Sequence, residues 1–446
     1  MRQRGKRRGN RPLRLILGGL LLAAVAYVLA AAWWQSRDQD QAFSAFLLPR
    51  LVDLVVVAWL FWVGAALGSF LNVVAYRLPQ GRSIGGFSAC PYCAQPIARG
   101  DNVPVFGWLA IRGRCRVCRM PISPRYPLVE LCVGLSLTLV GWGSIYHGGA
   151  NLPYFSTGGL GDGLWMPHLT KTSLAIGTYQ LLVVTGSWAF GLIRFDGQRI
   201  PVRLLGWVFA IAILPLLLWP PLQIVPWEVQ VADDWQPSSY IASLLRVVTA
   251  LAAAGLVGRG LGRALAPRGD IKMSPLGEQT SRLLDLIAML AVPALLVGWQ
   301  ALFGVALAAC LLAVLLGRWM PARGGLARLA VTLPPCLAVQ LAAWRWLDRS
   351  PFWPGTHSHP WTLLGFAFAL LIVAQWLKRP ARPATAATTP LAEPPARVPA
   401  NPSQPDPSQP SVANPSVANP SVVNTSVVNT LDDTDRSGSA GSAAPD

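Results

Sequence analysis

Long apolar runs separated by short polar segments make up most of the chain before its last seventy or so residues. A helix that spans a bilayer needs roughly 17 to 25 mostly apolar residues, and the pattern predicts an all-α polytopic membrane protein with about nine transmembrane helices. The run at 283–317 is long enough for a helical hairpin that turns at Gly298-Trp299-Gln300. The expected spans are 13–34, 51–75, 126–143, 173–193, 204–220, 239–257, 283–317, 328–345 and 361–377.

Basic residues gather in alternate loops, and the other loops are neutral or acidic. The positive-inside rule therefore places the N-terminus and the loop 77–125 in the cytoplasm and predicts a bacterial inner-membrane, multi-pass protein. The first apolar run is too long for a signal peptide and lacks a small-residue cleavage site, so we expect a retained anchor. The Arg/Lys-rich segments are 77–125, 194–203, 258–282, 318–328 and the segment from 378 onward.

Composition supports the membrane class, because 53% of the 446 residues are hydrophobic and only 13% are charged. The net charge of +17 is spread over short clusters rather than one face, so no nucleic-acid partner is expected. From Pro380 the chain is rich in Pro, Ala, Ser, Thr and Asn and carries a five-residue repeat, which predicts a disordered tail. The expected divisions are 1–45 (basic N-terminus and anchor), 46–142, 143–320 (membrane domain), 321–378 (additional helices) and 379–446 (tail).

Two C-x-x-C pairs stand about twenty residues apart in the loop 77–125. Such pairs can converge on one tetrahedral ion, and four thiolates leave no open coordination position, so they predict a structural Zn2+ site in a small cytoplasmic domain. Two disulfides are the alternative, which the reducing cytoplasm disfavours. The expected metal ligands are Cys90, Cys93, Cys115 and Cys118.

The residues around this site follow a recognisable order. GSFLNVVAYRLP begins at Gly68, DNVPVFGWL at Asp101, RGRC at Arg112 and PISPRYPLVEL at Pro121. In this order they resemble the amino-terminal domain of type IV prepilin leader peptidase/N-methyltransferases, over residues 64–132. The resemblance implies that the domain helps to methylate cleaved prepilins with S-adenosylmethionine. The residues it places in the substrate or methyl-donor region are Gly68, Ser69, Asn72, Arg77, Asp101, Asn102, Arg125 and Glu130.

Two of these positions carry a physical interpretation of their own. Gly68 begins a small, polar stripe where a partner helix or peptide can approach closely, with simple helix packing as an equal alternative. Glu130 lies just inside the next span, where an ionisable group needs a partner. Arg77 or Arg125 is the expected partner.

The protease half of the family uses two aspartates at the cytoplasmic membrane edge, one of them in a GxGD motif, and here both motifs are altered. GLIRFDGQRIPV, from Gly191, has Arg194 in the first catalytic position and Asp196 in an auxiliary one. Counting back from the helix that contains Gly298-Trp299-Gln300 puts Leu283 in the second position. Because a guanidinium stays protonated and an aspartic protease needs one protonated carboxyl, we expect proteolysis to be impaired.

Two other sequences imitate the missing motif. The literal GxGD ending at Asp162 falls in a predicted periplasmic loop, whereas Asp270 lies in a partial match on the cytoplasmic side. Asp196 and Asp270 are therefore the candidate catalytic residues if activity survives.

Three functions remain open from the sequence. The leading hypothesis is a family member that acts on prepilins or type II secretion pseudopilins with an intact zinc domain and impaired or lost cleavage. The second is a fully bifunctional peptidase, and the third is a noncatalytic membrane scaffold in pilus or secretion assembly. Expected partners are the lipid bilayer, prepilins or pseudopilins, and an active prepilin peptidase or assembly proteins.

Overall fold

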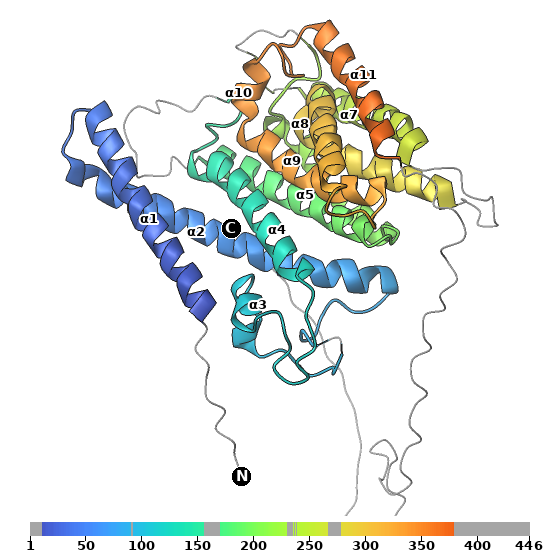
Figure 1. Cartoon of the computed structure of the whole chain (residues 1–446). Coiled ribbons are helices and arrows are strands. Elements are labelled where there is room, and N and C mark those ends of the chain that lie inside the picture. The colour runs from blue at the N-terminus through green and yellow to red at the C-terminus, as the bar shows by residue number, and fades with distance from the viewer. Residues whose placement is uncertain are drawn as a thin grey trace, which may run out of the picture. The chain divides into compact units, whose positions relative to one another are not determined.

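The computed structural model describes residues 11–90, 92–155, 170–229, 235, 237, 239–265 and 278–378, and its regular elements there are helices (Figure 1). The predicted tail, Asp162 and Asp270 lie outside these ranges. The helices are α1 (Arg11–Asp38), α2 (Phe43–Arg77), α3 (Phe106–Ala110), α4 (Arg125–Gly141), α5 (Lys171–Phe195), α6 (Val202–Leu218), α7 (Tyr240–Leu265), α8 (Glu278–Leu316), α9 (Gly325–Ala342), α10 (Trp344–Arg349) and α11 (Pro360–Trp376).

In the described part of the chain, seven helices are long and apolar enough to cross a membrane. They are α1, α2, α4, α5, α7, α8 and α9, while α6 and α11 are shorter apolar helices. The predicted all-helical architecture is therefore confirmed, with seven candidate spans among the described residues, and the exact number of spans stays a prediction. Helix α5 lies at the centre of the bundle, since most of its residues are buried and α8 and α9 pack against it.

Contacts between the helices define two ends of the bundle. At the cysteine end, Arg125 pairs with Asp196, and Arg323, just before α9, donates to the Phe195 carbonyl at 3.0 Å. The four-cysteine loop joins α2 to α4 at this end, beside α3 (Figure 1). At the opposite, far end, Asn151 donates to the Leu341 carbonyl near the end of α9 at 2.6 Å.

Helix α8 reverses direction at Gly298. The backbone there has φ 92° and ψ 162°, a region essentially closed to residues with a side chain. Asp285 near its start and Ala313 near its end both contact residues of the cysteine end, whereas Gln300 donates to backbone carbonyls of residues 226–228 at the far end. The hairpin expected from the length of this apolar run is therefore present, with its turn at the expected glycine.

A buried cation lies against this turn. Arg246 of α7 is 1% exposed and donates from Nη2 to the Leu296 carbonyl at 3.3 Å, in the last helical turn before the break. A helix end leaves carbonyls without intrahelical donors and carries partial negative charge, so a guanidinium is favourable there. This contact satisfies one nitrogen of a charged residue inside a candidate span, while Nε and Nη1 are buried without a hydrogen-bond partner among the described residues.

Glycines bring α2 and α4 together. A Cβ on Gly64 would lie 3.0 Å from the Cα of Gly134, and a Cβ on Gly68 would lie 2.9 Å from the Cα of Glu130. The small-residue stripe that begins at Gly68 is thus covered by α4. Of the two interpretations of that glycine, the structure supports helix packing.

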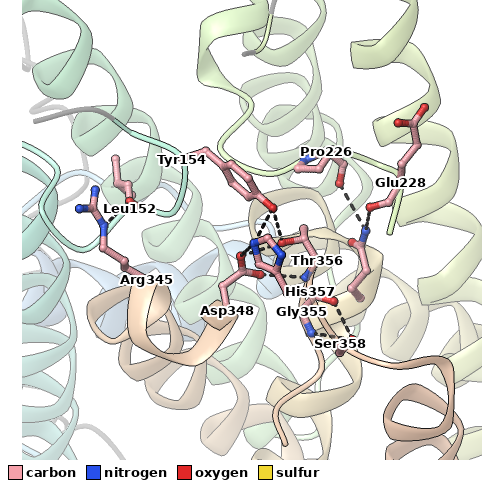
Figure 2. Close-up of polar contacts among 11 residues, drawn as sticks. Leu152, Tyr154, Pro226, Glu228, Arg345, Asp348, Gly355, Thr356, His357 and Ser358 are labelled. Atoms are coloured by element: carbon pink, nitrogen blue, oxygen red, sulfur yellow. Dashed lines mark hydrogen bonds and ion pairs between the residues drawn. The ribbon is translucent and has the colours of Figure 1, made fainter. Parts of the chain in front are cut away.

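Polar side chains tie the far end together (Figure 2). Asp348 of α10 accepts from the amide and hydroxyl of Thr356 at 2.9 and 2.7 Å. The Tyr154 hydroxyl lies 2.9 Å from Thr356 Oγ1 and 2.8 Å from His357 Nε2. This cluster fastens the segment after α4 to the connection between α10 and α11.

Candidate functional site

Two turns with the same hydrogen-bond pattern carry the four expected metal ligands. The Cys90 amide donates to the carbonyl five residues later at 3.0 Å, and its own carbonyl accepts from the amide four residues later at 2.9 Å. Cys115 repeats both bonds at 3.0 Å. Ala94 and Arg119, the donors of the second bond, both adopt positive φ, at 55° and 58°, and an isolated β-bridge closes each turn.

The turns bring four free thiols together. The sulfur atoms of Cys90, Cys93, Cys115 and Cys118 all lie within 4.8 Å of one another. Across the turns, Cys90 Sγ is 3.7 Å from Cys118 Sγ and Cys93 Sγ is 3.9 Å from Cys115 Sγ. Tetrahedral Zn2+ with Zn–S bonds of about 2.3 Å would hold its sulfurs about 3.8 Å apart, so the cluster fits a four-thiolate site.

Backbone donors prepare one of the ligands. The amide of Cys93, and after it the amide of Tyr92, lower the pKa of Cys90 to about 6. An unperturbed thiol ionises at about 8.5, and the thiolate is the form that binds metal. These backbone donors therefore favour the thiolate form of Cys90 that binds metal.

An ion pair and a ring hold the loop around the cluster. Arg116, between the last two cysteines, pairs with both carboxylate oxygens of Asp101, with Nη2 2.6 Å from Oδ1. Trp108 Nε1 donates to the Ile122 carbonyl at 2.9 Å. The indole covers Gly113, where a Cβ would lie 2.5 Å from the ring, so a larger residue cannot replace this glycine without moving the tryptophan.

Glu130 fastens the loop to α4. Its Oε2 accepts from the amide of Val105 at 2.7 Å, and Val105 adopts φ 61°, a conformation uncommon for a β-branched residue. The expected partner, Arg77 or Arg125, was wrong. Arg77 donates to the carbonyl of Gly85 at 2.5 Å and to neighbouring carbonyls, and Arg125 pairs with Asp196.

The residues assigned to substrate or methyl donor do not all meet. Gly68 and Glu130 are in contact, and Asn72 donates to the Tyr126 carbonyl at 3.4 Å while its Oδ1 is buried without a partner. Asn102 is exposed and Ser69 partly buried. Their roles stay predictions.

Asp196, the first candidate catalytic residue, is held by an arginine. It follows the last residue of α5, and its Oδ2 lies 2.6 Å from Nη2 of Arg125. Phe195 beside it lies under two guanidinium groups, Arg323 at 4.5 Å and Arg125 at 5.8 Å from the ring centroid. The second candidate, Asp270, lies outside the described residues.

One buried acid near Arg194, Asp285, was not among the residues predicted from the sequence. Its Oδ2 lies 3.1 Å from Nη1 of Arg194, and the two side chains are 10% and 6% exposed. Arg194 also donates to the Gln198 carbonyl at 2.7 Å. Counting back along the family motif put Leu283 in the position of the second acid. The signal that could have found Asp285 is its place between two leucines in an apolar run, where a carboxylate needs a partner or a function.

Comparisons with known proteins cover the amino-terminal part of the chain. Residues 62–144 match the model of the bacterial peptidase A24 N-terminal domain. No solved structure matches the chain.

Three curated relatives illustrate the likeness. The prepilin leader peptidase/N-methyltransferase of Klebsiella pneumoniae is 45% identical over 106 residues, 22% of this chain and 46% of its own length. The prepilin leader peptidase/N-methyltransferase of Myxococcus xanthus is 48% identical over 89 residues, which cover 20% of this chain and 27% of that protein. The type 4 prepilin-like proteins leader peptide-processing enzyme of an enterotoxigenic Escherichia coli is 41% identical over 95 residues. These residues cover 17% of this chain and 35% of that protein.

The matched part therefore spans less than half the length of each of these relatives. It contains all four cysteines of the cluster and also Glu130. Over this amino-terminal part, the chain is similar to the bacterial peptidase A24 N-terminal domain and to the prepilin leader peptidase/N-methyltransferases that carry it.

Proposed function

We propose that this chain is an inner-membrane protein that binds type IV prepilins or type II secretion pseudopilins, and that it has lost the cleavage of their leader peptides. The names of its relatives support the substrate class. The proposed loss of cleavage rests on the ion pair between Arg194 and Asp285.

The chemistry of an aspartic protease explains why this pair matters. Two carboxyls must share a proton and hold a water molecule between them, with one of them protonated at working pH. Here each described carboxylate at the cysteine end of α5 and α8 pairs with an arginine, Asp196 with Arg125 and Asp285 with Arg194. A guanidinium stays charged at every working pH, so Arg194, which stands where the family motif has its first catalytic acid, can neither share this proton nor act as a base.

The amino-terminal domain keeps a separate task. Its cysteines would hold a structural Zn2+, which supplies a rigid fold and no open position for chemistry. Beside it, the contact of Glu130 with the Val105 amide joins the metal loop to α4. We propose that prepilin binding, and methyl transfer from S-adenosylmethionine, use the cysteine loop and the adjoining end of α2, where Asn102 is exposed and Ser69 is partly exposed.

The orientation is part of the proposal. The arginine-rich cysteine end faces the cytoplasm and the far end faces the periplasm, as the distribution of charged loops favours. Prepilins would then meet the cysteine end before they are assembled.

Purified protein in detergent, a prepilin and radiolabelled S-adenosylmethionine test the proposal. We expect no cleavage of the prepilin, and label transferred to a precleaved pilin. Asn102→Ala should weaken that transfer, because Asn102 is exposed on the cysteine loop, whereas Arg37→Gln, an exposed change at the end of α1, should leave it unchanged.

Two results would redirect the proposal. Cleavage that Asp196→Asn or Asp270→Asn abolishes would establish the bifunctional enzyme and overturn the loss of proteolysis. Prepilin binding with neither reaction would leave the noncatalytic scaffold.

A further inference from the structure

A cavity opens at the far end of the bundle, where α9 passes into α10. It has a volume of about 310 Å3 and is lined by Ala150, Asn151, Ala342, Ala343, Arg345, Trp346 and Arg349. A pocket of this size lies at the lower limit for small-molecule sites. Its walls are mostly apolar apart from two guanidinium groups and one amide.

The two arginines face this cavity without a counter-charge. Among the described residues neither forms an ion pair, and the nearest acid in sequence, Asp348, is turned to Thr356 and His357. Figure 2 shows Arg345 reaching in the other direction, toward Leu152. Burial, and then the charge of Arg349, lower the pKa of Arg345, as expected when like charges are held together.

Arg345 is held in place by backbone groups. Its Nε donates to the Leu152 carbonyl at 2.8 Å and its Nη2 to the Phe155 carbonyl at 2.6 Å. These bonds fix one guanidinium at the rim of the cavity. Arg349 is exposed and makes no such bonds, so its side chain is free to close on a ligand.

The position along the helices identifies the surroundings of the cavity. It lies at the end of α9, a candidate membrane span, and before α11, a shorter apolar helix. Trp346 is 74% exposed at its edge, and Phe352 and Trp361 nearby are also exposed. Aromatic rings with a polar edge gather where lipid headgroups meet the acyl chains, so the cavity opens at headgroup level.

We propose that this cavity binds the headgroup of an anionic phospholipid, with the phosphate between Arg345 and Arg349 and with Trp346 against the upper acyl chain. Guanidinium groups bind phosphate oxygens through paired N–H donors, and the apolar walls suit the glycerol backbone. The site depends on the membrane placement of the helices and not on prepilin binding or methyl transfer.

Native mass spectrometry of the full chain, released from nanodiscs of equal parts phosphatidylcholine and phosphatidylglycerol, tests this site. We expect phosphatidylglycerol to be retained in preference to phosphatidylcholine, and Arg349→Gln to weaken that retention about fivefold, as the loss of about 1 kcal/mol for one basic group near a membrane surface predicts. Arg349→Lys should keep most of it.

Matched variants separate this site from general surface charge. Arg37, at the same far end, is stacked on Trp33 at 4.3 Å and lies outside the cavity, so Arg37→Gln should retain lipid like the unchanged protein. The Arg349 side chain makes no hydrogen bond or ion pair with the described residues, so the thermal unfolding of Arg349→Gln should also be unchanged. Equal retention by the two glutamine variants would overturn the proposal, and displacement of the lipid by inorganic phosphate would reduce the cavity to a free phosphate site.

Discussion

Arg194 and Asp285 come from helices far apart in sequence and meet where both side chains are almost fully buried. Each group loses much of its hydration, and the attraction between them compensates only while both are present. Removing one partner leaves an isolated buried charge, which costs more than replacing both by apolar groups. The pair therefore constrains the two helices strongly, although it adds little net stability.

A double-mutant cycle measures this constraint. We expect Asp285→Leu to lower the free energy of unfolding by about 3 to 5 kcal/mol, and Arg194→Met with Asp285→Leu to lower it much less. Chemical unfolding in detergent followed by circular dichroism gives the values. The exposed pair formed by Arg116, whose side chain is 65% exposed, serves as the control, because Arg116→Gln should cost no more than about 1 kcal/mol. Additive effects of the two buried substitutions would contradict the coupling.

The cysteine cluster leads to a prediction about metal content. Cys90→Ser should abolish the binding of Zn2+ and expose the loop around Trp108 to protease, because three thiolates no longer complete the tetrahedral set. Metal analysis of the purified protein by mass spectrometry gives the stoichiometry. Cys132→Ser is the matched control, since Cys132 is a free thiol on α4 and not part of the cluster. Unchanged zinc in the Cys90 variant would show that the cluster is not the metal site.

At the scale of elements, the turn inside α8 determines which residues meet at the cysteine end. If α8 continued straight through Gly298, Ala313 would lie outside the bundle, past its far end. The turn at Gly298 instead returns the second arm to Arg328 and α9. The conformation of Gly298 thus determines where the second arm of α8 lies relative to α9.

Substitution of this glycine tests the point. Gly298→Ala should lower the unfolding free energy by about 1 to 3 kcal/mol, since its φ of 92° suits only glycine and a Cβ would lie 2.6 Å from Nη1 of Arg246. Gly255→Ala on α7 is the control, because a Cβ there meets nothing within 4 Å and alanine should stabilise the helix interior by about 0.5 to 1 kcal/mol. Thermal unfolding of both variants compares them, and equal shifts would contradict a strained turn.

Much at this scale could be predicted from the sequence. Apolar length and the Gly298-Trp299-Gln300 break sufficed for the helices and the hairpin, and cysteine spacing sufficed for the cluster, since both depend on local order along the chain. The partners of Glu130 and of Asp285 could not be found in this way. They depend on which helix ends lie side by side, and register counting along one motif contains no information about that arrangement.

For the whole molecule, the two ends of the bundle differ in charge and in chemistry, and this difference predicts orientation. In intact spheroplasts of cells that express the chain, a membrane-impermeant maleimide should label Gln39→Cys, in the exposed turn after α1 at the far end, and should not label Ser123→Cys, exposed beside the cluster. Detergent lysis should make Ser123→Cys reactive. The opposite pattern would reverse the proposed orientation.

The mutual dependence of Arg194 and Asp285 also bears on how such a chain can evolve. A lineage that altered either residue alone would pass through a destabilised intermediate, which selection removes when stability margins are narrow. A lysine at position 194 would keep the charge but lose the planar fork of donors, so it would replace only part of the pairing with Asp285. Related chains should therefore retain or exchange the two residues together.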